Sequence, residues 1–258
     1  MCNIEKGNSV VLLKRLEKNS VDLVVTSPPY DNLRNYHESE VGWNFDIFKQ
    51  IAQELFRVVK QGGVVIWVVG DKTDKGSETG TSFKQALYFK EIGFNIHDTM
   101  IYRKENYVPL THNRYEQEFE YMFCFSKGKP KTFNPIKIPC KYAGTEHWGN
   151  ASYYKTDSDD LTGVGKKKVN DFKIKGNIFT YRVGSTTGSG KYKHPAMFPL
   201  DLAKDQIMSW SNENEIVLDP FMGSGTTGVA CKELNRNFIG FELDDKYFEI
   251  CKERLNLF

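Results

Sequence analysis

Short apolar runs alternate with segments of helical periodicity along most of the chain. Residues 21–25 form one apolar run, and residues 63–70 form another that is apolar at nearly every position. A strand buried on both faces has this second pattern, which is typical of the centre of a parallel sheet. Further strands are predicted at 96–102, 119–125, 216–218 and 237–241. This alternation predicts an α/β fold with helices covering a sheet.

Apolar positions recur at helical spacing between these runs. Residues 45–60 are one such segment, and Gln61-Gly62-Gly63 supplies the glycine signal that ends many helices. Residues 244–255 are another, and Asp244 is of a type favoured as an N-cap. Further helices are predicted at 82–92, 200–210 and 227–234.

The periodic pattern stops between Ser126 and His194. Glycines, lysines, serines and aromatic residues follow one another there without a sustained period. The stretch is long for a connection inside a compact domain, and such stretches are usually functional or mobile. We therefore expect a main domain of residues 1–126 and 192–258, interrupted by an irregular insertion of residues 127–191.

Positive charge is concentrated in this insertion. The whole chain has a net charge of only +2, but residues 127–193 hold fourteen Lys and Arg against five Asp and Glu, which gives +9. The rest of the chain therefore carries −7. Basic residues interleaved with aromatic ones suit a surface that meets phosphates and bases. A solvated basic loop is the alternative, and charge alone does not decide between them.

The composition excludes several classes of protein. No apolar stretch approaches the roughly 20 residues that span a bilayer, and the first residues lack the apolar core of a signal peptide, so we expect a cytoplasmic protein without a membrane partner. The five cysteines are scattered and form no Cys-x-x-Cys pair, and the five histidines are equally dispersed. Neither a disulfide framework nor a metal site is predicted.

A glycine-rich turn near residue 225 is the first candidate site. Gly223, Gly225 and Gly228 fit the spacing G-x-G-x-x-G between a predicted strand and a predicted helix, and Glu242 follows at the end of the next strand. Glycines let the backbone approach a ligand closely, and such an acid accepts hydrogen bonds from ribose hydroxyls. The turn predicts a nucleoside-bearing cofactor, of which a dinucleotide is one candidate.

Asp219 distinguishes among such cofactors. It ends the strand before the turn, where its carboxylate would repel a pyrophosphate and attract a cationic amino-acid group. Only thirty residues follow Gly228, too few to complete a dinucleotide-binding sheet without upstream strands. Both observations favour a ligand like S-adenosylmethionine.

The second candidate site is the turn Ser27-Pro28-Pro29-Tyr30, which follows the strand at 21–25. The two prolines fix φ and lack N–H donors, so nearby carbonyls keep fixed directions and can accept hydrogen bonds. Ser27 adds a side-chain acceptor and Tyr30 a flat ring. This combination suits a planar ring that carries an amine, although plain proline turns are common after strands.

Together the two turns resemble the motifs of the amino-group DNA methyltransferases. Residues 26–30 resemble the catalytic motif, and residues 219–227 resemble the S-adenosylmethionine motif. Their order is similar to that of the beta class, in which the target-recognition region lies between the two motifs. The resemblance implies a circularly permuted Rossmann-like methyltransferase fold, with a mixed, mostly parallel seven-stranded sheet and helices on both faces. It also implies that the insertion of residues 127–191 recognises the target.

The resemblance implies specific roles for residues. The catalytic residues it implies are Ser27, Pro28, Pro29 and Tyr30. The cofactor-binding residues it implies are Asp219, Pro220, Phe221, Gly223, Ser224, Gly225, Thr226, Thr227 and Glu242, joined by Lys193, His194 and Pro195, whose segment resembles the one that lines the methionine side of the cofactor.

The implied activity is site-specific transfer of a methyl group from S-adenosylmethionine to the exocyclic amine of a base flipped out of double-stranded DNA. Ser27, where adenine-N6 enzymes more often have Asp, favours cytosine N4, and adenine N6 stays open. A dinucleotide-dependent oxidoreductase and a non-catalytic nucleic-acid-binding module are the alternatives. A prokaryotic or phage-encoded enzyme acting on nucleoid DNA is expected, with a homodimer and a cognate restriction endonuclease as candidate partners.

Overall fold

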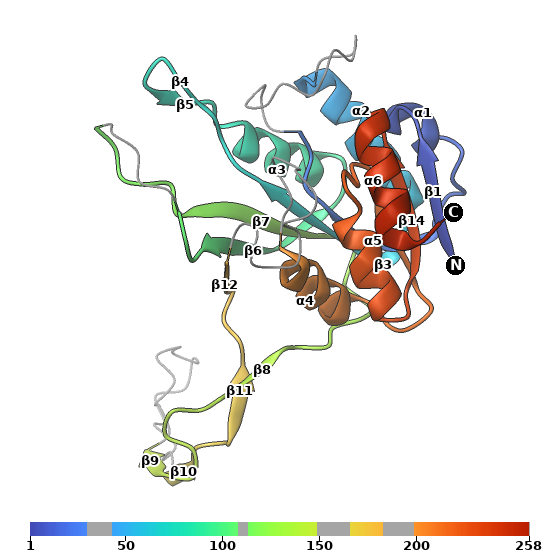
Figure 1. Ribbon diagram of the computed structural model, residues 1–258. Helices are drawn as coiled ribbons and strands as arrows, with labels where there is room; N and C mark the ends of the chain where they lie inside the picture. Colours follow the sequence, from blue (N-terminus) through green and yellow to red (C-terminus); the bar gives the residue numbers. More distant parts are fainter. Residues whose placement is uncertain (30–42, 108–112, 149–165, 183–198, 258) are drawn as a thin grey trace. The chain divides into compact units, whose positions relative to one another are not determined.

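The computed structural model describes residues 1–29, 43–107, 113–148, 166–182 and 199–257 (Figure 1). The chain forms two compact units. The larger unit comprises Met1–Asn134 and Asn177–Phe258, and the smaller unit comprises Pro135–Gly176. Among the described residues, no helix has the length and apolar character that crossing a membrane requires.

An eight-stranded sheet forms the centre of the larger unit, in the order β1-β14-β13-β2-β3-β7-β6-β12. Its strands are β1 (Cys2–Lys6), β2 (Val21–Thr26), β3 (Val59–Val69), β6 (Asn95–Lys104), β7 (Phe119–Ser126), β12 (Ile178–Tyr181), β13 (Ile216–Asp219) and β14 (Asn237–Glu242). Seven of these strands run in one direction and β7 runs against them. The mixed, mostly parallel sheet predicted from the sequence is confirmed.

The sheet has eight strands, whereas the family resemblance implied seven. The six strands predicted from hydrophobic periodicity are joined by one further strand at each edge, which periodicity does not reveal. Strand β1 pairs with β14, and strand β12 pairs with β6. Both edge strands have alternating or mainly exposed positions, so neither forms the continuous apolar run that marks a central strand.

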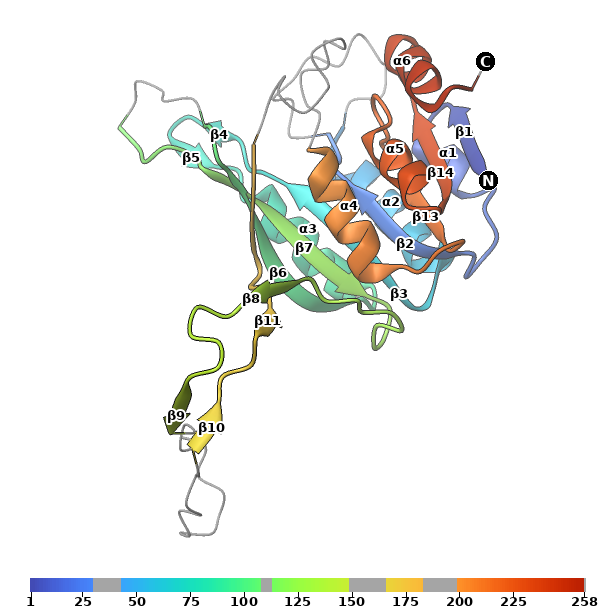
Figure 2. The same cartoon turned by 60° about the horizontal axis from the view of Figure 1, so that its bottom comes forward.

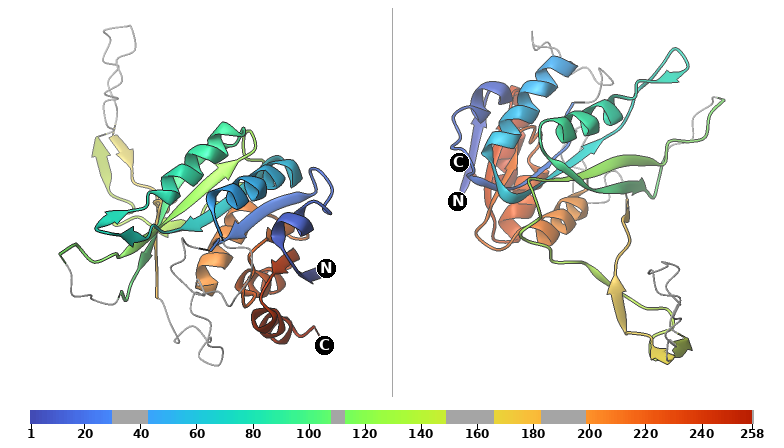
Figure 3. Two further views of the ribbon diagram at one scale, coloured as in Figure 1. Left: turned by 90° about the horizontal axis from the view of Figure 1, so that it is seen from above. Right: turned by 180° about the vertical axis from the view of Figure 1, so that it is seen from behind.

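Helices cover both faces of this sheet, as expected (Figures 2 and 3). One face contacts α1 (Ser9–Leu13), α2 (Phe45–Val58) and α3 (Thr81–Glu91). The other contacts α4 (Leu200–Trp210), α5 (Thr226–Glu233) and α6 (Asp245–Leu255). Asp244 caps α6 as predicted, since its side chain accepts a hydrogen bond from the amide of Tyr247 at 3.0 Å.

The boundary between α2 and β3 differs from the prediction. The helix ends at Val58, and β3 begins at Val59, so Gly62 and Gly63 lie inside a strand rather than after a helix. A Cβ on Gly63 would lie 2.8 Å from the carbonyl oxygen of Asp22 in the neighbouring strand. The glycines therefore allow close strand contact at an irregularity in the β2–β3 register instead of ending the helix.

The main core lies between β2, β3 and the helices α1–α3. Trp67 of β3 is fully buried, and its ring meets the rings of Phe48 and Phe89 edge to face at 5.9 and 5.1 Å. Its indole N–H donates to the side-chain oxygen of Gln85 at 2.8 Å, which satisfies the one polar atom of this ring. This packing fixes the positions of β2 and β3, and thereby of the ends from which the following turns start.

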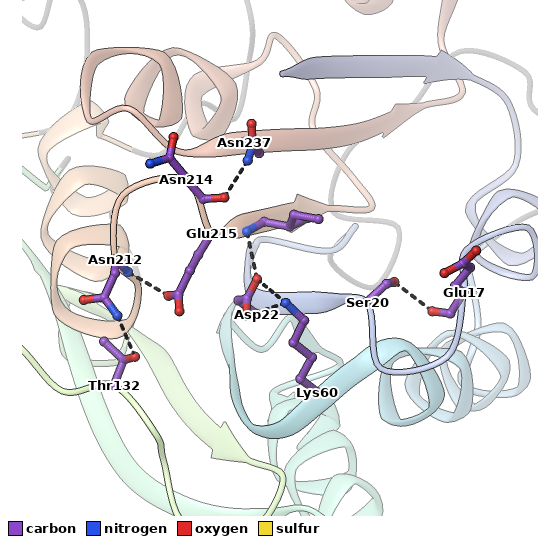
Figure 4. A network of polar contacts seen from close by, with 10 residues as sticks. Glu17, Ser20, Asp22, Lys60, Thr132, Asn212, Asn214, Glu215 and Asn237 are labelled. Carbon is purple, nitrogen blue, oxygen red and sulfur yellow. Dashed lines mark hydrogen bonds and ion pairs between the residues drawn. The ribbon is translucent and has the colours of Figure 1, made fainter.

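Polar contacts tie together the edge of the sheet where the parallel strands begin (Figure 4). Asp22 of β2 accepts hydrogen bonds from Lys60 Nζ at 2.7 Å and from the backbone amide of Ile216 in β13 at 2.9 Å. Nearby, Asn237 donates to the carbonyl oxygen of Asn214 at 2.5 Å. One carboxylate thus fixes the relative positions of β2, β3 and β13 at their amino ends.

Three two-stranded antiparallel pairs complete the described strands. In the larger unit, β4 (Thr73–Asp74) pairs with β5 (Ser77–Glu78). The smaller unit contains two antiparallel ribbons, formed by β8 (Lys137–Pro139) with β11 (Phe172–Ile174), and by β9 (Glu146–Trp148) with β10 (Lys166–Lys168). The smaller unit lies within the expected insertion of residues 127–191, and residues 127–134 and 177–182 are grouped with the larger unit.

Candidate active site

The two candidate turns lie side by side because the strands that precede them are parallel neighbours. Strand β2 pairs with β13 through Leu23–Val217 and Val24–Leu218. The chain leaves β2 towards β3 through α2 on one face, and it leaves β13 towards β14 through α5 on the other face. Ligands of open α/β sheets bind outside the carboxyl ends of the strands at such a switch point. The topology therefore predicts that the functional site lies at this edge of the sheet.

Asp219 connects the two turns. Its Oδ1 accepts hydrogen bonds from Thr26 Oγ1 at 2.6 Å and from the amide of Phe221 at 3.1 Å, and its Oδ2 accepts from Thr227 Oγ1 at 2.7 Å. Only 1% of the residue is exposed. Asp219 ends its strand as expected, but the chain itself supplies three donors to its carboxylate. Direct contact with the ammonium of a ligand stays a prediction.

Burial and hydrogen bonding shift the pKa of this carboxylate in opposite directions. Burial raises the pKa of Asp219 to about 6, while the hydrogen bonds from Thr26, Thr227 and the Phe221 amide oppose the rise. At neutral pH the group is therefore mostly ionised and acts as an acceptor. This state matches the two threonine hydroxyls that donate to it.

The glycine loop (residues 220–225) joins β13 to α5 and requires glycine at its end. Gly225 has φ +81°, the left-handed region that favours glycine. A Cβ at this position would also lie 2.5 Å from the Sγ of Cys251 in α6. The amide of Gly225 donates to the carbonyl oxygen of Met222 at 2.8 Å, which closes the turn. The loop is thus tight, and α6 packs directly against it.

Arg254 of α6 holds the same loop by hydrogen bonds. Its Nη1 lies 2.7 Å from the carbonyl oxygen of Ser224, 3.0 Å from the hydroxyl of Ser224 and 3.3 Å from the hydroxyl of Thr226. Ser224 and Thr226 are buried. Two of the residues expected to bind cofactor thus have side chains engaged by α6, so their contribution to a ligand would come through the backbone.

Glu242 lies at the end of β14, next to the glycine loop. Its Oε2 accepts from the amide of Gly223 at 2.8 Å, and its Oε1 accepts from the amides of Leu243 and Asp244, each at 2.8 Å. Burial raises the pKa of Glu242, and these amides oppose the rise. A half-buried carboxylate oriented by backbone amides beside a glycine turn fits an acceptor for ribose hydroxyls.

Two of the expected cofactor residues anchor the loop to the core. The ring of Phe221 lies edge to face against Trp43 at 5.3 Å and against Trp67 at 6.3 Å. The carbonyl oxygen of Pro220 accepts a hydrogen bond from Ser9 Oγ at 2.5 Å. The start of α1 therefore also supports the glycine loop.

The turn after β2 is described as far as Pro29. Pro28 is buried, and Ser27 and Pro29 are half-buried. Tyr30, Lys193, His194 and Pro195 lie outside the described residues. The structure therefore brings together Ser27, Pro28, the glycine loop, Asp219 and Glu242 at one edge.

Three supporting residues hydrogen-bond to this edge, namely Thr26 from β2, Ser9 from α1 and Arg254 from α6. Thr26 lies in the motif of residues 26–30, but the sequence assigned it no role of its own. Ser9 and Arg254 were not predicted and carried no signal in the sequence. Among the described residues, no group of three or more His, Cys, Asp or Glu side chains could hold a metal ion.

Comparisons with known proteins agree with this geometry. A family model described as DNA methylase matches residues 21–253. The chain is 52% identical over 241 residues to the orphan methyltransferase M.BamHII of Bacillus amyloliquefaciens, covering 92% of this chain and 89% of that protein.

Solved structures show the same fold. The crystal structure of the M1.HpyAVI–SAM complex matches with a TM-score of 0.65 and 29% identity, covering all of both chains. The PvuII DNA methyltransferase, described as cytosine-N4-specific, matches with a TM-score of 0.66 over 99% of this chain and 93% of that chain. Its 18% identity shows a shared fold alone.

These matches decide among the functions considered from the sequence. They favour the methyltransferase over the dinucleotide-dependent oxidoreductase and the non-catalytic nucleic-acid-binding module, with S-adenosylmethionine as cofactor. The chain belongs to the N6/N4 amino-group DNA methylase family and is a DNA methyltransferase.

Proposed function

We propose that the protein methylates the exocyclic amine of a base flipped out of double-stranded DNA at a specific sequence. The observation that supports this proposal is the pairing of β2 with β13, because the segment that contains Ser27 and Pro28 and the glycine loop follow these two neighbouring strands. An acceptor turn and a cofactor loop at one switch point form the arrangement that direct transfer between two bound molecules requires.

The residues of the glycine loop and Glu242 fit S-adenosylmethionine. Gly223 and Gly225 leave backbone without side chains at the turn, and the Glu242 carboxylate is oriented towards that turn by the Gly223 amide. When bound, the cofactor supplies an electrophilic methyl group on a sulfonium sulfur. Pro220, Phe221, Ser224, Thr226 and Thr227 shape the loop, and Lys193, His194 and Pro195 complete the proposed cofactor set.

The acceptors of the proline turn activate the amine. The lone pair of an exocyclic amine is delocalised into the base, which makes the nitrogen a poor nucleophile. The Ser27 side chain and the Pro28 carbonyl accept hydrogen bonds from the N–H groups and favour a more tetrahedral nitrogen. Pro29 fixes the turn, and Tyr30 stacks on the flipped base, which offsets part of the few kcal/mol that flipping costs. Alignment of the two reactants supplies about 7 kcal/mol or more.

Cytosine N4 is the preferred amine in this proposal. Ser27 stands where the family's adenine-N6 enzymes more often carry Asp, and a serine hydroxyl is an adequate acceptor for the cytosine amine. Adenine N6 is the second candidate, because the same acceptor geometry serves either amine.

Recognition of the target is assigned to the smaller unit. It carries exposed lysines on its described ribbons and their connections, namely Lys137, Lys141, Lys168 and Lys173. Lysines at such positions neutralise phosphates and displace counterions from DNA. A homodimer and a cognate restriction endonuclease remain predictions from the family resemblance.

The test is methyl transfer by the purified protein. Unmethylated plasmid DNA is incubated with S-adenosylmethionine carrying a labelled methyl group, digested to nucleosides and compared with N4-methylcytosine and N6-methyladenine standards. We expect label in N4-methylcytosine, and sequencing with modified-base detection then maps the site. Label in N6-methyladenine would reverse the choice of base.

Matched serine variants show whether the proline turn performs the chemistry. Ser27→Ala removes the proposed acceptor and should lower the transfer rate by about 100-fold. Ser77→Ala, in the exposed β4–β5 hairpin, makes the same change outside the site and should leave the rate unchanged. Label on a ring carbon, or an unaffected Ser27→Ala variant, would contradict the proposal.

A further inference from the structure

The residues that hold the two turns together are buried polar groups with no access to solvent. Thr26, Thr227 and Asp219 are all at or near zero exposure, and they form a chain of hydrogen bonds from β2 through β13 to α5. Water does not compete for such bonds, and loss of one partner leaves another buried and unsatisfied. The three side chains therefore act as one rigid unit.

Each end of this chain lies next to a functional segment. Thr26 is the last residue of β2 and directly precedes Ser27 and the two prolines. Thr227 is the second residue of α5, two positions after the glycine loop, and its hydroxyl also lies 3.4 Å from the carbonyl oxygen of Val25. The carboxylate of Asp219, which lies 193 positions after Thr26 in the sequence, thus connects the end of β2 to the start of α5.

We propose that Asp219 is a positioning residue that, through Thr26 and Thr227, sets the distance and angle between the Ser27-Pro28 acceptors and the glycine loop. This inference rests on the proposed function, because it assigns the two turns to the base and to the cofactor. Its consequence is that loss of the Thr26 hydroxyl impairs methyl transfer more than cofactor binding.

The alternative role of Asp219 makes a different prediction. If its carboxylate bound the ammonium of the cofactor directly, both Asp219→Asn and Thr26→Val would act on cofactor binding, and the transfer rate at saturating cofactor would change little. Thr26→Val is therefore the decisive variant, since valine matches threonine in shape and removes only the hydroxyl.

The experiment measures cofactor affinity and transfer rate separately. Affinity for S-adenosylmethionine comes from titration calorimetry, and the rate comes from a single turnover on DNA with saturating cofactor. For Thr26→Val we expect the rate to fall by about tenfold or more, because small misalignments of reacting groups are costly, while the affinity changes by less than about threefold. Thr26→Ser, which restores a hydroxyl, should recover most of the rate.

Two comparisons complete the design. The double variant Thr26→Val/Asp219→Asn should transfer methyl no more slowly than Asp219→Asn alone, since both changes break the same link. Thr99→Val, an exposed strand position of β6, is the matched control and should behave as wild type. If Thr26→Val does not fold, as judged by urea unfolding, Thr26→Ala replaces it.

The outcomes separate this inference from the proposed function. A wild-type rate for Thr26→Val, or additive losses in the double variant, would overturn the coupling while leaving methyl transfer itself established. Absence of transfer by the wild-type protein would instead overturn the proposed function.

Discussion

Arg254 Nη1 donates hydrogen bonds both to the backbone carbonyl oxygen of Ser224, at 2.7 Å, and to its hydroxyl, at 3.0 Å. A C-terminal helix thus fixes the conformation of a loop that it does not belong to. We expect Arg254→Ala to weaken binding of S-adenosylmethionine by about tenfold, because the loop must then be ordered when the cofactor binds. Titration calorimetry measures the change.

Variants of the same helix test the specificity of this effect. Arg254→Lys keeps the charge but carries it on a shorter side chain that does not place a nitrogen where Nη1 lies, so its affinity should lie between those of wild type and Arg254→Ala. Lys252→Ala removes a neighbouring cation whose ion pair is with Glu249 and should bind the cofactor as wild type does. Equal losses for Arg254→Ala and Lys252→Ala would contradict a role for the Ser224 contact.

Gly225→Ala should destabilise the protein through both backbone strain and a steric clash. The chain offers a matched control, because Gly76 has the same φ of +81° but nothing within 4 Å of its added Cβ. Gly76→Ala therefore measures strain alone, about 1 kcal/mol. Gly225→Ala should lose about 1–3 kcal/mol more in the free energy of unfolding, since its Cβ meets Cys251. Urea unfolding compares the two.

A second change checks the origin of that difference. Cys251→Ala removes the sulfur atom that a Cβ on Gly225 would meet. In the Cys251→Ala background, the cost of Gly225→Ala should fall towards that of Gly76→Ala. A cost that stays the same would show that the loss does not come from contact with Cys251.

Glu242→Gln should weaken S-adenosylmethionine binding by about tenfold or more. A glutamine has one acceptor oxygen, so its NH₂ group must face either the amide of Gly223 or the amides of Leu243 and Asp244, all of which are donors. Both the loop and the ribose acceptor are then disturbed. Glu249→Gln, on the exposed side of α6, is the control. Wild-type affinity in Glu242→Gln would remove Glu242 from the proposed cofactor site.

Asp219 should make a distinctive contribution to the pH dependence of stability. Its folded pKa of about 6 lies above the ordinary value of 3.8, so between these pH values the folded state binds more protons than the unfolded state. The free energy of unfolding contributed by this group therefore falls as pH rises through this window, by on the order of 3 kcal/mol at most.

The comparison with Asp219→Asn isolates that contribution. The stability of wild type relative to the variant should be greater at about pH 4.5 than at about pH 7.5. Between these pH values the folded wild type loses the proton of Asp219, whereas the asparagine of the variant does not titrate. Urea unfolding at both pH values measures the difference. A difference that grows with pH would show that the hydrogen bonds outweigh burial and hold the pKa below its ordinary value.

Lysines of the smaller unit should contribute to DNA affinity through charge. The triple variant Lys137→Gln/Lys168→Gln/Lys173→Gln should bind DNA more weakly, and the slope of log K against log salt should decrease by up to about 0.9 for each phosphate that is no longer neutralised. Its affinity for S-adenosylmethionine should not change. Replacing exposed Lys84 and Lys90 of α3 instead is the control. An unchanged salt slope in the triple variant would remove these lysines from the DNA surface.

The central strands and both turns could be predicted from sequence because buried parallel strands are continuously apolar. Residues 63–70 identified the core of β3, and the Ser-Pro-Pro and glycine motifs identified the ends of β2 and β13. Edge strands escaped the same reasoning, since β1 and β12 present exposed side chains to solvent. A local sequence pattern thus identifies an element whose own residues are mostly buried.

Contacts between elements could not be predicted from such local patterns. Asp219 was recognised as an acid at a strand end, but its partners Thr26 and Thr227 depend on which strands pair and how they align. Arg254 looked like an ordinary basic residue in the last turn of an amphipathic helix. Its contact with Ser224 arises because α5 and α6 lie on the same face of the sheet.

The pairing of β2 with β13 also constrains how the protein can be synthesised. Strand β2 leaves the ribosome long before β13. One edge of β2 can therefore pair with β3 early, but the other edge stays unpaired until β13 has been synthesised. An apolar strand with an open edge is prone to pair with other chains. We therefore expect nascent chains to expose this edge of β2 until β13 pairs with it, and the two turns to become neighbours only then.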